Sequence, residues 1–104
     1  MVANPIRIRA RVKGDVTEVT MLLAHPMETG LRKDAAGALV AAHYITDVLV
    51  LAEGRTVLEA RMSQAVSQDP LLSFRFRGAK PGDRITVSWT DSRGEQRSDT
   101  VPVS

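Results

Sequence analysis

Hydrophobic and polar residues alternate with a period of two along much of the chain, which is typical of half-buried β-strands. The first two such runs, residues 6–13 and 16–23, flank a Gly-Asp turn and predict an opening hairpin or a strand that crosses between sheets. The next two, residues 45–51 and 56–62, flank a Glu-Gly-Arg turn and predict a second hairpin.

Three further strands are expected in the second half of the chain, at residues 72–76, 85–90 and 97–103. Pro81 and Gly82 predict a type II turn before the second of these, because proline presets φ and glycine accepts a positive φ. About seven short strands without a helical window predict an all-β fold, an Ig-like (fibronectin/immunoglobulin-type) antiparallel β-sandwich. The length of 104 residues suits one domain, residues 1–104.

The alternation stops between residues 26 and 42, where we expect a long ordered loop or a short extra strand pair. Loops of this length inside a compact domain are often functional. Met27 lies in this stretch without a strand face to occupy, so it either contacts a partner or packs beneath the loop. Trp89, by contrast, is in phase with Ile85 and Val87 and is predicted to lie in the core.

The composition is that of an ordinary soluble globular domain, with 43% hydrophobic and 25% charged residues and a net charge of +2. The basic residues at positions 7, 9, 11 and 13 alternate with apolar ones, so we expect them to cover the solvent face of one strand and not to bind nucleic acid. No segment approaches the roughly 18 apolar residues of a membrane span. The first residues lack the apolar run of about 7–15 residues of a secretory signal, and taken alone this predicts a cytoplasmic protein.

The side chains offer little chemistry of their own. Without cysteine the chain has neither a thiol nor a blue-copper ligand, and His25 and His43 lack the spacing of a zinc site. For His25 a structural or loop-bonding role is favoured. Asp83 and Asp91 are expected to cap turns, and no serine lies in a G-x-S-x-G motif. We therefore expect no catalytic residue, no metal and no cofactor, and hence no enzyme.

The segment from His25 to Gly37, His-Pro-Met-Glu-Thr-Gly-Leu-Arg-Lys-Asp-Ala-Ala-Gly, resembles the signature of the SoxZ family of the thiosulfate-oxidising Sox system. His43-Tyr44-Ile45, residues 65–74 and residues 78–83 are similar to the family in the same order. The resemblance thus covers most of the chain.

This resemblance implies a β-sandwich subunit that forms a tight heterodimer with a SoxY-type partner. In the family, a mobile Gly-Gly-Cys-Gly-Gly arm at the partner's C-terminus carries covalent sulfur adducts and presents them to separate Sox enzymes, which dock transiently. It also implies the periplasm, reached by export with a partner that bears the signal. The expected partners include no nucleic acid and no membrane.

A permanent heterodimer needs an apolar contact surface. The interface candidates are Met27, Leu31, Leu39, Val40 and Tyr44, each of which has ordinary core packing as its alternative. Arg32 and Lys33 are candidates for the attraction of anionic sulfur adducts. Two other functions stay open from the residues alone: a stand-alone Ig-like binding or structural module, and, more weakly, a small redox or metal protein.

Overall fold

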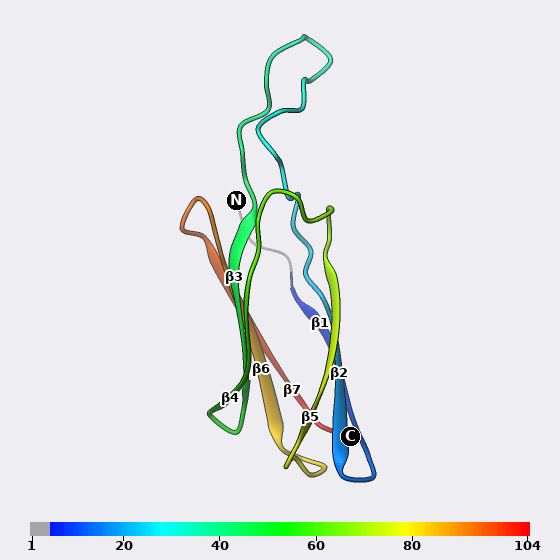
Figure 1. Ribbon diagram of the computed structural model, residues 1–104. Coiled ribbons are helices and arrows are strands. Elements are labelled where there is room, and N and C mark those ends of the chain that lie inside the picture. The colour runs from blue at the N-terminus through cyan, green and yellow to red at the C-terminus, as the bar shows by residue number, and fades with distance from the viewer. Residues whose placement is uncertain (1–4) are drawn as a thin grey trace.

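The computed structural model describes residues 5–104, and these form seven antiparallel strands in two sheets. The confirmed fold class is all-β, consistent with an Ig-like sandwich, and Figure 1 shows the two layers face to face. Within the described residues there is no helix with the length and hydropathy to cross a membrane. The strands are β1 (Arg7–Lys13), β2 (Val16–Leu22), β3 (Ile45–Ala52), β4 (Arg55–Arg61), β5 (Leu71–Arg77), β6 (Arg84–Asp91) and β7 (Gln96–Pro102).

The smaller sheet has the order β1-β2-β5 and the larger sheet the order β4-β3-β6-β7. The two predicted hairpins, β1-β2 and β3-β4, are both present. The second is irregular, because its register shifts between Val50 and Leu51. The C-terminal residue Ser104 exchanges backbone hydrogen bonds with Ala10 and Val12 of β1, which joins the end of the chain to the edge of the smaller sheet.

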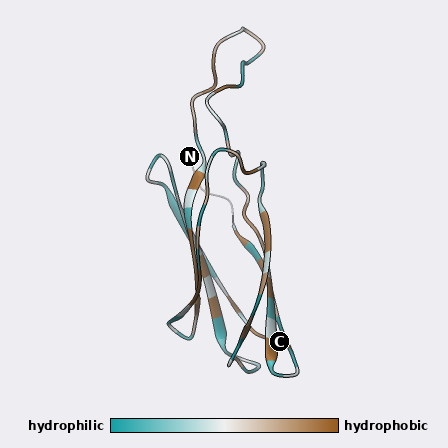
Figure 2. Cartoon of the chain, viewed as in Figure 1, coloured by the Kyte–Doolittle hydropathy of each residue, from teal (hydrophilic) through white to brown (hydrophobic). Residues whose placement is uncertain are grey.

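The core lies between the sheets and follows from the period-two pattern, which Figure 2 shows as hydrophobic and hydrophilic residues in turn along the strands. Trp89 is 3% exposed, as its phase predicted. Phe74 and Phe76 pack against the core with ring centroids 6.0 Å apart, so the aromatic face of β5 also points inward as expected.

The turn between β5 and β6 confirms the sequence prediction. Gly82 has φ of 93°, and the N–H of Asp83 donates to the carbonyl of Lys80 at 3.1 Å. The side chain of Asp83 caps the same turn by accepting from the N–H of Lys80 at 3.1 Å.

Candidate functional site

The segment without strand periodicity forms a projecting arm, here defined as residues 28–43, which extends beyond the sandwich at the top of Figure 1. Its two legs pair at the base, where the backbones of Glu28 and His43 exchange hydrogen bonds of 2.7 and 3.0 Å. Further out, Lys33 and Leu39 form a second bridge. The arm accounts for much of the molecule's length, since the principal extents are 53 × 20 × 18 Å. Of the two predicted alternatives it is the long ordered loop, because its two legs meet only in isolated β-bridges and form no regular strand.

The tip of the arm is a turn built on Asp34. Its side-chain Oδ1 accepts from the N–H groups of Ala36 and Ala38 at 2.9 and 3.0 Å. Its backbone carbonyl accepts from the N–H of Gly37, whose φ of 84° suits glycine. The tip is thus an ordered element and not a loose end of the loop.

The arm exposes apolar side chains that a monomer usually buries. Leu31 is 82% exposed and Leu39 is 63% exposed, and five alanines along the arm are also exposed. Between residues 31 and 42 the only charged residues are Arg32, Lys33 and Asp34. Exposed apolar residues gathered in this way are typical of surfaces that contact another molecule.

The five interface candidates divide between surface and core. Leu31 and Leu39 lie on the exposed arm, whereas Val40 and Tyr44 are half-buried. Met27 is only 5% exposed and belongs to the core, so it offers almost no surface to a partner; packing beneath the loop, the alternative given for it, describes its position. The reason is local: its N–H donates to Nδ1 of His25 at 3.0 Å, and its Sδ accepts from the N–H of Ile45 at 3.3 Å.

Of the two candidates for anion attraction, Arg32 is already paired. Its guanidinium binds both carboxylate oxygens of Glu28, with the shortest distance 2.7 Å. The hydrogen bond and charge of Glu28 raise the pKa of Arg32, and those of Arg32 lower the pKa of Glu28. Lys33 is exposed and has no ion pair with any residue of the described chain. Of the two, only Lys33 has no ion-pair partner, and with Glu28 and Asp34 the arm carries no net charge.

Three buried polar side chains meet at the base of the arm: His25, which precedes it, His43, which ends it, and Asp91 at the end of β6. Oδ2 of Asp91 lies 3.0 Å from Nε2 of His25 and 2.7 Å from Nε2 of His43. The two imidazole rings contact edge-on with centroids 4.6 Å apart, and Trp89 packs edge-on against His25 at 5.1 Å. One carboxylate therefore ties both ends of the arm to the larger sheet.

The second oxygen of Asp91 binds the turn that follows β6. Oδ1 accepts from the N–H groups of Arg93 at 3.0 Å and Glu95 at 2.9 Å, which confirms the predicted turn cap. Burial of this carboxyl raises its pKa. Hydrogen bonds from His25, His43 and these two backbone N–H groups outweigh burial and hold the pKa of Asp91 below its usual range. The group is thus an ionised acceptor surrounded by four donors.

The hydrogen-bond pattern also fixes which nitrogen of His25 carries its hydrogen. Since Nδ1 accepts from the N–H of Met27, the ring hydrogen lies on Nε2, where it is donated to Asp91. The cluster offers three metal-ligand atoms within 4.8 Å of one another. Coordination through Nε2, however, would require the hydrogen to move to Nδ1, opposite the N–H of Met27. The donor set therefore fits a hydrogen-bond network and not a metal centre, in keeping with the predicted loop-bonding role of His25.

The backbone at the base of the arm is held in an unusual conformation. Met27 has φ of 49°, a region that side chains other than glycine rarely adopt. Such residues cost about 1–3 kcal/mol and persist where their surroundings fix them. The hydrogen bonds to His25 and Ile45 supply that constraint, so the buried cluster also sets the direction in which the arm leaves the sandwich.

The link among His25, His43 and Asp91 was missed from the sequence, because the two histidines were judged by spacing and Asp91 by its turn alone. One signal was available. The only two histidines of the chain lie immediately before and after the non-periodic stretch. If that stretch doubles back as a strand pair, its two ends must lie side by side.

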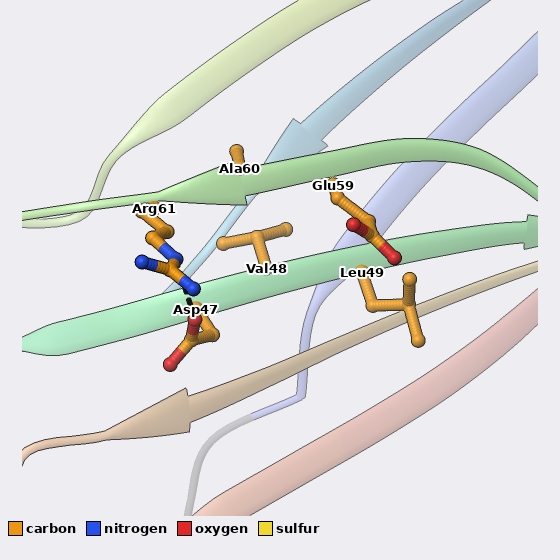
Figure 3. Close-up of a pocket in the computed structure, with 6 residues that line it drawn as sticks. All are labelled: Asp47, Val48, Leu49, Glu59, Ala60 and Arg61. Carbon is orange, nitrogen blue, oxygen red and sulfur yellow. Dashed lines mark ion pairs between the residues drawn. The ribbon is translucent and has the colours of Figure 1, made fainter.

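Surface depressions elsewhere are shallow. Figure 3 shows one on β3 and β4, lined by residues 47–49 and 59–61, with Arg61 and Asp47 forming an ion pair of 4.0 Å. Its walls are cross-strand neighbours of a single hairpin, and no group of buried polar side chains converges on it. It has the form of a sheet surface and not of a substrate pocket.

Several solved structures have a fold similar to that of this chain. A hypothetical protein from Pyrococcus horikoshii OT3 superposes with a TM-score of 0.69 at 15% identity, over 97% of this chain and 88% of that one. A superoxide reductase (neelaredoxin) from Archaeoglobus fulgidus gives 0.60 at 20% identity, over 96% and 87% of the two chains. At these identities the likeness concerns the fold alone. No curated protein sequence is significantly similar to this chain.

A family model gives the more specific result. The model described as sulphur oxidation protein SoxZ matches residues 6–102, which include every strand, the arm and the buried cluster. The chain therefore belongs to the SoxZ family of sulfur-oxidation proteins.

Proposed function

We propose that this chain is the non-catalytic subunit of a SoxYZ-type sulfur-carrier complex in thiosulfate oxidation. The observation that carries the proposal is the family match over residues 6–102, joined to the absence of cysteine in the sequence. Covalent carriage of sulfur requires a thiolate. The thiol must then belong to another chain, a SoxY-type subunit whose C-terminal cysteine arm bears the adducts, and the role of this chain is to hold that subunit and to offer docking surfaces.

The exposed part of the arm is the surface we assign to the SoxY-type subunit. Leu31 and Leu39 project from an ordered loop whose base is fixed by Asp91, so they approach a partner with little loss of backbone freedom. A permanent interface buries more than about 2,000 Å² in total. The arm alone does not provide this area, so the partner must also cover part of the adjoining sandwich near Val40 and Tyr44.

We place the complex in the periplasm, with export on a signal carried by the partner. The proposal rests on the family, since the residues by themselves predicted the cytoplasm. Fractionation of cells that express both subunits, compared with cells that express this chain alone, tests it. Periplasmic recovery should require the partner.

The direct test of the assembly is co-expression with the neighbouring open reading frames of the genome, followed by affinity capture of this chain. A partner recovered in a 1:1 ratio whose sequence ends in a glycine-flanked cysteine supports the proposal. A chain that stays monomeric beside such a partner contradicts it and leaves a stand-alone Ig-like module as the better description.

A further inference from the structure

The two outer faces of the sandwich differ in charge. On the smaller sheet, the outward positions of β1, β2 and β5 carry six basic side chains and a single acidic one, Glu18. We call this surface the basic face. On the larger sheet, β3 and β4 expose charges of both signs, and β6 adds a single outward charge, Arg84. The other outward positions of β6 and β7, apart from Pro102, carry hydroxyl and amide side chains: Thr86, Ser88, Thr90, Gln96, Ser98 and Thr100. The six basic residues of the basic face are Arg7, Arg9, Arg11, Lys13, Arg75 and Arg77.

The basic face has a much larger net positive charge than the chain as a whole. The chain has 14 basic and 12 acidic residues, a net charge of only +2. With six of the basic residues and one of the acidic residues on this face, the rest of the molecule carries a surplus of acidic groups. The molecule is therefore strongly polarised, and such a field steers the approach of charged partners.

Three of the six basic residues of the basic face form ion pairs, with two acidic residues between them. Glu18 pairs with Lys13 at 3.1 Å and with Arg75 at 3.0 Å, and Arg77 approaches Asp15 at 3.7 Å. Among the described residues, Arg7, Arg9 and Arg11 form no ion pair, although Arg11 lies opposite Glu18 and its charge helps to lower the pKa of that carboxyl. They form a row of exposed guanidinium groups along β1, an edge strand of its sheet.

The shape of the basic face points to a protein and not to a nucleic acid or a small anion. Proteins that bind single-stranded nucleic acid stack bases on exposed aromatic rings, and both phenylalanines of β5 face inward here. The surface is a pleated sheet without an enclosing pocket for a small anion. One end carries apolar side chains, with Leu71 66% exposed beside Leu22, and mixed arginine and apolar surface is typical of protein interfaces.

The area indicates a transient contact. Strands of seven residues at about 3.3 Å per residue, with three strands about 4.8 Å apart, give a face of roughly 23 by 14 Å. A footprint of this size without an apolar centre does not have the form of a permanent interface. Charges on so small a surface act mainly on the rate of encounter.

We propose that the basic face is the docking surface for an acidic patch on a protein that visits the carrier complex transiently, with carboxylates bound by Arg7, Arg9 and Arg11. This inference rests on the proposed function. If that function holds, the proteins that dock here are the enzymes that act on the sulfur adducts. The basic face is a stronger source of attraction than Arg32 and Lys33, because Glu28 neutralises Arg32.

The test uses the purified heterodimer and a fluorescent 20-residue polyglutamate peptide as the acidic probe, with binding measured by anisotropy at low and at physiological salt. In the double variant Arg7→Glu/Arg9→Glu the new carboxylates lie opposite Leu22 and Thr20, away from Glu18. Arg61→Glu/Arg93→Glu makes the same change in net charge at exposed positions outside the basic face and serves as the control.

We expect the first variant to weaken probe binding at least ten-fold, the control to change it less than two-fold, and physiological salt to weaken binding to the unmodified heterodimer. Equal effects of the two variants would overturn the assignment. Tighter binding of a 20-nucleotide oligo-dT that is lost in the same variant would assign the face to nucleic acid and overturn the proposal. Recovery of the SoxY-type subunit with both variants shows separately that the heterodimer is intact, so a failure here differs from a failure of the proposed function.

Discussion

At the scale of single residues, Asp91 holds the base of the projecting arm in place. Its carboxylate accepts four hydrogen bonds, two from the imidazoles of His25 and His43 and two from the backbone of the following turn. The sequence around Asp91 predicted only a turn, because His25 and His43 lie 66 and 48 residues away from it. Contacts of such separation are set by the fold, and period-two patterning does not encode them.

Replacement of Asp91 by asparagine is predicted to destabilise the fold strongly. The amide would direct an N–H group toward buried donors, and each buried donor left unsatisfied costs about 1–3 kcal/mol. Urea unfolding followed by circular dichroism measures the loss. Asp83→Asn is the matched control, because Asp83 also caps a turn but binds no histidine. The free energy of unfolding should fall much less in this variant. Equal losses would show that the histidine contacts add nothing.

The lowered pKa of Asp91 also predicts a dependence on pH. Because its pKa is lower in the folded state than its usual 3.8, the stabilisation is fully present above about pH 4 and is lost as the pH falls through the folded value. The difference in unfolding free energy between the unmodified chain and Asp91→Asn should therefore narrow below pH 4. A difference at pH 3 as large as that at pH 7 would contradict this account.

At the scale of elements, the strands follow from the sequence and the arm does so only in part. Alternation of one hydrophobic and one polar residue is a local property, so both hairpins, the turn at Gly82 and the inward phase of Trp89 were predictable. The arm has no such pattern, because exposed Leu31 and Leu39 have no sheet partner to bury them. For the same reason the sequence did not decide whether Met27 is buried beneath the loop or exposed to a partner.

The arm gives a prediction of its own. The double variant Leu31→Ser/Leu39→Ser should fold with nearly unchanged stability, because both side chains are exposed and make no core contact. It should bind the SoxY-type subunit at least ten-fold more weakly, as measured by calorimetry. Leu71→Ser is the control, since Leu71 is 66% exposed on a strand outside the arm. Unchanged affinity in the double variant would remove the arm from the interface.

At the scale of the whole molecule, the features divide among three regions. An ordered apolar arm extends from one end, a basic face covers one sheet, and the outward positions of β6 and β7 on the other sheet are mostly hydroxyl and amide side chains. None of these regions contains a thiol, and the best-connected polar cluster is buried beneath the arm. Such an arrangement suits a rigid support that holds one partner permanently and meets others briefly, with the sulfur chemistry located on the partner.

The most direct test of this account is the intact mass of both subunits after oxidation of thiosulfate by the assembled system. The account predicts that the SoxY-type subunit gains the mass of a sulfur adduct at its cysteine, while the mass of this chain stays at its unmodified value. A covalent adduct on this chain, or turnover of thiosulfate without an adduct on the partner, would contradict it.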